Sequence, residues 1–99
     1  MAYLGLDLGS SSAKAVAVGR DGQVIAKAGC DVALHQPAPD VAEQSPDDVW
    51  AAACEALRSC TEQLGDRPIK AIGLSGAMHT LAPLDTAGRP LARAMTWAD

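Results

Sequence analysis

A chain of 99 residues with a formal charge of −4 and a sequence pI of about 4.9 forms at most one small domain, and no basic cluster fits it for nucleic acid or an anionic membrane. Hydrophobic residues make up 48% of the chain but include no Phe, so a core must be built from Ala, Val, Leu and Ile. No apolar run approaches the ~20 residues that span a bilayer, and no N-terminal signal pattern is present, which predicts a cytoplasmic location.

The N-terminal segment predicts a strand over residues 3–8, a polar turn, and a second strand over 14–18. The turn combines Asp7, Gly9 and three consecutive serines. Gly9 lets the backbone approach an anion closely, and main-chain N–H groups and hydroxyls can donate hydrogen bonds to it. Asp7 can face a magnesium ion and Lys14 supplies one cation. We interpret this as a phosphate-binding hairpin rather than a P-loop, which would need Gly-Lys-Ser/Thr opening a helix; an ordinary hairpin is the alternative.

The next segment continues the meander. Asp21-Gly22 is a strong hairpin signal, and residues 23–32 alternate as a third strand, so that the first three strands form an antiparallel sheet. Residues 33–46 contain three prolines and predict a loop. His35 in this loop is expected to be exposed or to pin the loop rather than to bind a ligand.

A long helix is predicted from Ser45 as N-cap, with Pro46 at the first helical position, to about Leu64, ending at Gly65. Trp50 is expected to anchor this helix in the core. The face expected to pack on the sheet consists of Trp50, Ala53, Cys54, Leu57, Cys60, Thr61 and Leu64, and the outer face of Glu55, Arg58, Glu62 and Gln63. The odd number of cysteines and their spacing favour reduced structural thiols at Cys30, Cys54 and Cys60 over a metal site or a disulfide framework.

Residues 68–75 predict a short apolar strand, which should pair parallel with the first strand because a helix connects them. Loops at the carboxyl ends of parallel strands commonly carry sites. Residues 76–79 and Asp7 occupy this position. Residues 81–84 and 91–97 are expected to form another hairpin around the turn at 85–90.

Three motifs together resemble the FGGY carbohydrate kinases, which belong to the actin-like ATPase group. The first is Asp7-Leu8-Gly9-Ser10-Ser11-Ser12-Ala13-Lys14, similar to the first phosphate motif of that family. The second is Ala42-Glu43-Gln44-Ser45-Pro46 followed by Trp50. The third is Ser75-Gly76-Ala77-Met78-His79-Thr80 followed by Met95-Thr96-Trp97-Ala98-Asp99, which is most similar to gluconate kinases. The resemblance covers nearly the whole chain, in order.

The resemblance implies roles for individual residues. Gly9, Ser10, Ser11 and Ser12 would line the path of the ATP phosphates, with Lys14 beside it and Asp7 holding Mg²⁺ through water. Relatives often carry Thr at positions 10 or 11, which keeps the hydroxyl. For Asp7, the alternative is a turn-capping role.

The sugar side is implied by a second set of positions. Met78 and His79 match positions that face the sugar, although a pair packed inside a hairpin is the alternative. Trp97 and Asp99 match residues near the sugar pocket. In xylulokinase-like relatives a Gln precedes the pair that matches Met78 and His79, whereas this chain has Ala77, as gluconate kinase-like relatives do.

The fold class implied is α/β, the ribonuclease H-like half of an actin-like kinase, with residues 1–99 as the N-terminal part of the first, sugar-binding domain and the rest of the enzyme absent. The general base would be a downstream aspartate and the adenine pocket would come from the C-terminal domain, so no catalytic residue is expected in this chain. The implied function is ATP-dependent phosphorylation of a sugar or sugar acid, gluconate first and xylulose second. A non-catalytic actin-like module that binds nucleotide or sugar is the alternative, and a homodimer is left open.

Overall fold

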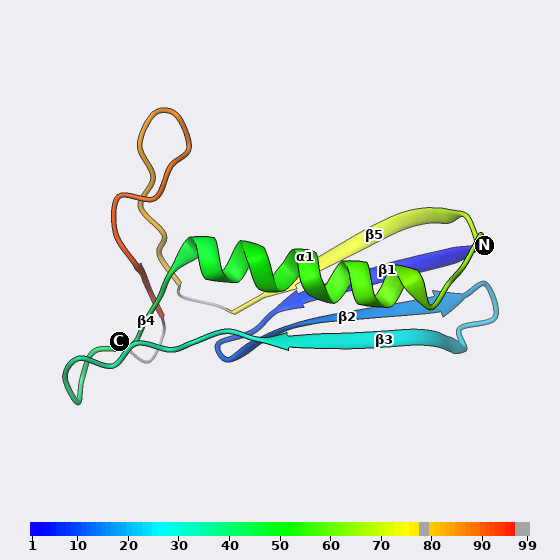
Figure 1. The fold of residues 1–99 in the computed structure, drawn as a ribbon, viewed down its shortest axis with the longest axis horizontal. Coiled ribbons are helices and arrows are strands. Elements are labelled where there is room, and N and C mark those ends of the chain that lie inside the picture. Colours follow the sequence, from blue (N-terminus) through cyan, green and yellow to red (C-terminus); the bar gives the residue numbers. More distant parts are fainter. Residues whose placement is uncertain (78–79, 97–99) are drawn as a thin grey trace.

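The computed structural model describes residues 1–77 and 80–96, and its main feature is a four-stranded sheet with one long helix across one face (Figure 1). The strand order is β3-β2-β1-β5, in which β5 runs parallel to β1 and the other pairs are antiparallel. A second sheet pairs β4 with β6. The elements are β1 (Ala2–Leu8), β2 (Ser12–Gly19), β3 (Val24–Asp31), β4 (Glu43–Gln44), α1 (Pro46–Glu62), β5 (Ile69–Gly76) and β6 (Ala94–Met95). The predicted meander, long helix and parallel crossover are confirmed.

The antiparallel arrangement of β1, β2 and β3 follows from the alternation of buried and exposed residues along the strands and from a tight turn between β2 and β3. Alternate residues of β1 and β2 are buried against α1, while their neighbours face the other side of the sheet. Between β2 and β3, Gly22 has φ 83°, a conformation that L side chains rarely adopt, and its N–H donates to Gly19 O (3.0 Å). Asp21 Oδ1 accepts a hydrogen bond from Gln23 N (3.1 Å) and completes the turn.

The helix begins at Pro46, as predicted, because proline fits the first helical position and Asp47 and Asp48 follow in the positively polarised first turn. The Ser45 side chain makes no capping hydrogen bond in the described structure, although its carbonyl accepts the N–H of Val49 (3.1 Å). The helix ends at Glu62, slightly before the expected Leu64, and Gly65 follows with φ 62°.

The buried side of α1 differs from the prediction. Trp50 is 72% exposed, so its assignment as a core anchor is wrong. At 3.6 residues per turn, Trp50 lies roughly a quarter of a turn from the middle of the buried stripe. That stripe consists of Ala52, Ala53, Ala56 and Cys60, and Leu64 beyond the helix end is buried with it. Small side chains at these positions meet Ala13, Ala15 and Ala17 of β2, and a large ring does not fit between such closely packed layers.

Other members of the expected face are only partly buried. Cys54, Leu57 and Thr61 are half-buried, while Glu55 and Arg58 lie on the outer side as predicted and form an exposed ion pair (2.8 Å). Cys30, Cys54 and Cys60 are free thiols, and burial raises the pKa of Cys60.

The segment predicted as a plain loop over 33–46 contains a short strand, β4. His35 and Glu43 exchange backbone hydrogen bonds (2.7 and 2.9 Å), so His35 closes this loop through its main chain. The later hairpin is present in reduced form, as bridges between Leu81 and Met95 and between Leu84 and Pro90. Among the described residues, no helix combines the length and apolarity needed to cross a membrane.

Candidate functional site

The polar turn between β1 and β2 is shorter than predicted, because β2 begins at Ser12 rather than at Lys14. Gly9, Ser10 and Ser11 make the turn, and Gly9 N donates to Ser12 O (2.9 Å) across it. A Cβ on Gly9 would lie 3.2 Å from that same carbonyl oxygen, which explains glycine at this position. Ser12 therefore belongs to the strand and stands beside the turn.

Two carbonyl groups of this turn are bound by distant segments: Ser10 O accepts from Gln44 Nε2 (2.6 Å) and Ser11 O from Val32 N (2.9 Å). The carbonyls at the flanking strand ends are also occupied, Leu8 O by Ala77 N (2.9 Å) and Ser12 O by Gly9 N (2.9 Å). By contrast, the amide groups of Ser10 and Ser11 donate to no partner within the described ranges. The carbonyls of Ser10 and Ser11 are thus occupied while their N–H donors are free within those ranges, and this is the polarity that binds an anion.

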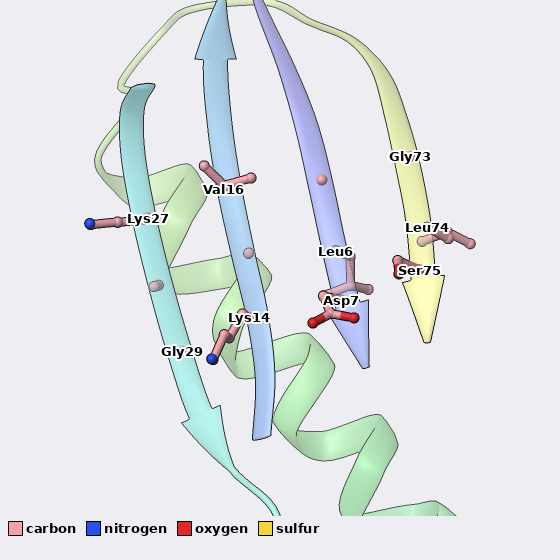
Figure 2. Close-up of a pocket in the computed structure, with 12 residues that line it drawn as sticks. Leu6, Asp7, Lys14, Val16, Lys27, Gly29, Gly73, Leu74 and Ser75 are labelled. Atoms are coloured by element: carbon pink, nitrogen blue, oxygen red, sulfur yellow. The ribbon is translucent and has the colours of Figure 1, made fainter. Parts of the chain in front are cut away.

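A polar row continues from this turn on the sheet face opposite α1. Asp7 pairs in register with Lys14 on one side and with Ser75 on the other, and all three residues are exposed. Figure 2 shows the Asp7 carboxylate and the Lys14 ammonium group on this open face. The Asp7 side chain forms no hydrogen bond or ion pair with the other residues that the structure describes, so its oxygens are free to meet a ligand.

The polar row borders a hollow of about 740 Å³ in the same face of the sheet. Gly5 and Gly73 are cross-strand neighbours, and Gly29 pairs with Lys14, so three positions in the hollow lack side chains. The rest of the lining is largely aliphatic, including Val16 and Leu74 (Figure 2). The hollow thus brings one carboxylate and two lysines, Lys14 and Lys27, to the edge of an apolar surface.

A metal at this site would have few protein ligands. In residues 1–77 and 80–96, no group of three or more His, Cys, Asp and Glu side chains could hold a metal ion. Mg²⁺ suits such a place, because it keeps several waters and binds through one or two carboxylates plus phosphate oxygens. Asp7, which is exposed and has no partner in residues 1–77 and 80–96, fits this role.

The predicted sugar-side residues Met78, His79, Trp97 and Asp99 lie outside the described residues. Ala77 is hydrogen-bonded to Leu8, next to the polar turn, and Thr96 N and Oγ1 both donate to Ala42 O (3.0 and 2.9 Å).

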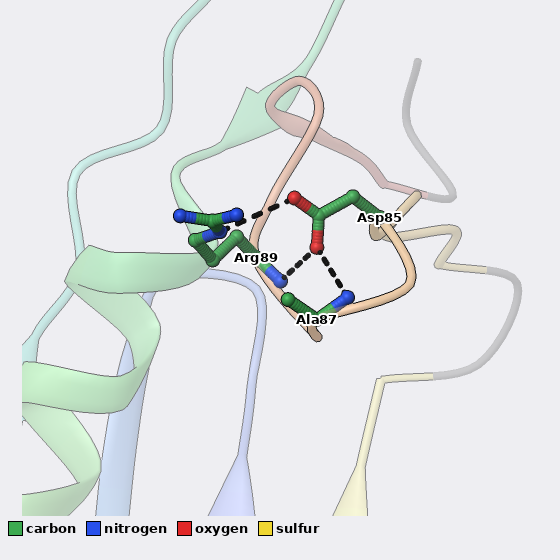
Figure 3. A network of polar contacts seen from close by, with 3 residues as sticks. All are labelled: Asp85, Ala87 and Arg89. Atoms are coloured by element: carbon green, nitrogen blue, oxygen red, sulfur yellow. Dashed lines mark hydrogen bonds and ion pairs between the residues drawn. The ribbon is translucent and has the colours of Figure 1, made fainter.

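Between Ala77 and Thr96, residues 85–89 form a polar turn that connects Leu84 with Pro90. Asp85 Oδ1 accepts hydrogen bonds from Ala87 N (2.9 Å) and Arg89 N (2.8 Å), and Oδ2 accepts one from Arg89 Nε (3.3 Å) (Figure 3). These contacts are local, and they give Asp85 a turn-forming role rather than a site role.

Two residues at the site were missed by reasoning from the sequence. Ser75 lies in the third motif without a role implied for it, although its place at the end of a parallel strand is a usable signal. Gln44 likewise lies in the second motif without an implied role. Its contact with the turn spans 34 residues and has no local signature.

Comparison with known proteins shows the family to which this fold belongs. Residues 2–99 match the N-terminal domain of the FGGY family of carbohydrate kinases. A gluconokinase of Bacillus licheniformis is 36% identical over 97% of this chain, and a xylulose kinase of Escherichia coli K12 is 33% identical over 98%. The structure of a xylulose kinase from Rhodospirillum rubrum superimposes on the whole chain with a TM-score of 0.95 at 27% identity. That of a gluconate kinase from Lactobacillus acidophilus also covers the whole chain, with a TM-score of 0.89 at 28% identity.

The similarity confirms the expected α/β class, the ribonuclease H-like (actin-like ATPase) half-domain with its mixed sheet. The chain spans about a fifth of the length of these relatives, 19% and 20% of the two relatives compared by sequence and 21% and 20% of the two solved structures. This chain belongs to the FGGY family of carbohydrate kinases.

Proposed function

We propose that this chain is the N-terminal part of the sugar-binding domain of a cytoplasmic kinase that transfers the terminal phosphoryl group of ATP to a sugar or sugar acid. The observation that carries the proposal is the polar turn, in which the Ser10 and Ser11 carbonyls are engaged while the amides of the same two residues have no partner among the described residues. The Asp7–Lys14 row beside it supports the same conclusion.

The residues of this chain would act by positioning and by charge. The N–H groups of Ser10 and Ser11, with the hydroxyls of the three serines, would bind phosphate oxygens and hold the terminal phosphate in one orientation. Lys14 would add one positive charge to this path. Asp7 would hold a hydrated Mg²⁺, which would neutralise charge that develops on the phosphates. The base that deprotonates the sugar hydroxyl would come from outside this chain.

The choice of sugar rests on fewer residues. Ala77, in the place of a glutamine in xylulokinase-like relatives, favours gluconate, and relatives named gluconokinase and xylulose kinase are similar at 36% and 33% identity. Met78, His79, Trp97 and Asp99 are the proposed sugar contacts. Gluconate carries a carboxylate, which needs a local donor because the chain has a net charge of −4.

The test is a substrate panel with the complete kinase that contains this chain. We expect sugar-dependent ADP release, with a higher kcat/KM for gluconate than for xylulose. A higher value for xylulose would make the protein a xylulose kinase. Tight binding of nucleotide or sugar with no ADP release would instead support a non-catalytic binding module.

Replacement of His79 tests the sugar side separately. Loss of a donor to a buried charged group costs about 1.5–3 kcal/mol, or roughly ten- to a hundredfold in affinity. His79→Ala should weaken gluconate binding by that factor in calorimetric titration and leave the KM for ATP unchanged. Unchanged gluconate affinity would make His79 a packing residue.

A further inference from the structure

Gln44 is a buried polar residue with a single directed contact. It is 4% exposed, and its Nε2 donates to Ser10 O at 2.6 Å, in the middle of the polar turn. A buried amide without a partner costs free energy, so this bond is one that the fold must keep. The two-residue strand β4 holds the Gln44 backbone, because Gln44 pairs with Ala94 of β6.

The Gln44–Ser10 bond also fixes the direction of a neighbouring donor. The carbonyl of Ser10 and the N–H of Ser11 belong to one planar trans peptide unit, in which the two bonds point in opposite directions. Because Gln44 holds the carbonyl toward the protein, the Ser11 N–H must point away from it. Val32, which bonds the next carbonyl, does the same for the following peptide with a backbone group.

We propose that Gln44 is a positioning residue that orients the Ser11 amide toward the bound phosphate. It does not touch the nucleotide and acts only through the peptide unit between Ser10 and Ser11. The inference rests on the proposed function, since it requires that the turn binds the phosphates of ATP.

The test uses Gln44→Met in the complete kinase, because methionine keeps the length of the side chain and removes the donor. The matched control is Gln63→Met: Gln63 Nε2 likewise donates to a distant backbone carbonyl, Lys27 O of β3 at 3.0 Å, and also to Ser59 O at 3.2 Å, but at the exposed C-terminal end of α1. Titration calorimetry with AMP-PNP and with AMP measures how much the distal phosphates add to binding.

In Gln44→Met, we expect the ratio of AMP-PNP affinity to AMP affinity to fall roughly three- to tenfold, because one oriented hydrogen bond to the phosphates is lost. In Gln63→Met, the ratio should stay unchanged. The kcat of Gln44→Met should fall while the sugar affinity holds. A residue with a purely structural role would lower the melting temperature without changing this ratio. An unchanged ratio in Gln44→Met overturns the inference.

A second variant covers the case in which Gln44→Met does not fold. Gln44→Asn keeps a polar amide but is one methylene too short for the bond, so it should lower the ratio in the same way. If both variants melt below the assay temperature, Gln44 is a core residue and the inference is wrong. If the wild-type kinase phosphorylates no sugar, the proposed function fails instead.

Discussion

The exposed carboxylate of Asp7, near the end of β1, is placed to face a ligand rather than to cap the turn. Its neighbours in the sheet are Lys14 and Ser75, and its carboxylate has no partner among the residues that the structure describes. A carboxylate that only capped the turn would accept hydrogen bonds from the turn amides, as Asp21 and Asp85 do in theirs. Asp7 therefore resembles a ligand-facing residue more than a turn cap.

Asp7→Asn in the complete kinase should lower kcat by at least ~10²-fold and leave sugar affinity nearly unchanged, because the change removes a charge near the phosphates and keeps the shape. Steady-state kinetics and sugar titration measure the two effects. Asp66→Asn, an exposed aspartate between α1 and β5, is the control and should behave as wild type. A kcat of Asp7→Asn within a few-fold of wild type would contradict this prediction and leave Asp7 with a turn-capping role.

Cys60 gives a prediction about pH. Burial raises the pKa of its thiol, so the folded protein holds the proton that the unfolded chain releases above roughly pH 8.5. Its contribution to stability is complete below that pH and is lost as the pH rises toward the folded value. Thiol labelling at pH 8, mapped by mass spectrometry, should modify Cys30 and Cys54 well before Cys60. Equal labelling rates at all three sites would contradict the buried position.

At the scale of the element, the helix α1 shows why small residues decide its packing. The buried stripe is nearly all alanine, and it meets an alanine-rich strand, so the two layers approach closely. Each buried alanine contributes little area, and the fit of backbone on backbone replaces large side chains. A larger side chain at this contact would therefore overpack it.

Ala56→Leu should therefore destabilise the 99-residue chain by about 1–3 kcal/mol, the usual effect of overpacking. Ala51→Leu makes the same chemical change on the exposed side of the same helix and should alter the free energy of unfolding by less than about 0.5 kcal/mol. Urea unfolding followed by circular dichroism compares the two variants. Similar losses would mean that α1 lies differently on the sheet.

At the scale of the whole molecule, the edge strand β5 stands out. All eight of its residues are exposed, and Leu74 reaches 75% exposure beside the open hollow. Large exposed apolar surfaces mark sites that another structure covers. The relatives are about five times as long as this chain, so they have ample further sequence to cover such a surface.

If the proposed function holds, the 99-residue chain by itself should release no ADP in response to any sugar, because the proposed base and adenine pocket would come from other parts of the enzyme. A coupled assay with gluconate, xylulose and glycerol measures this. The complete kinase serves as the positive control at equal molar concentration. Sugar-dependent ADP release above background would show that the chemistry resides within these residues.

The amino-acid sequence by itself determined the features that short-range physics encodes. Alternating strands, the Asp-Gly turn and Pro46 at the helix start each depend on residues within a few positions of one another. The place of Asp7 after an apolar strand could be read in the same way, and its role in holding Mg²⁺ stays a prediction from the family motifs.

Only the tertiary structure decided the rest. The alanines of β2 pack against the alanines of α1 and so decide which side of the helix is buried. Trp50 lies outside that side and is exposed. The pairing of β4 with β6 and the bond from Gln44 to Ser10 join segments that are tens of residues apart. No local pattern specifies such partners, because the free energy of each contact is set by what the complete fold brings opposite it.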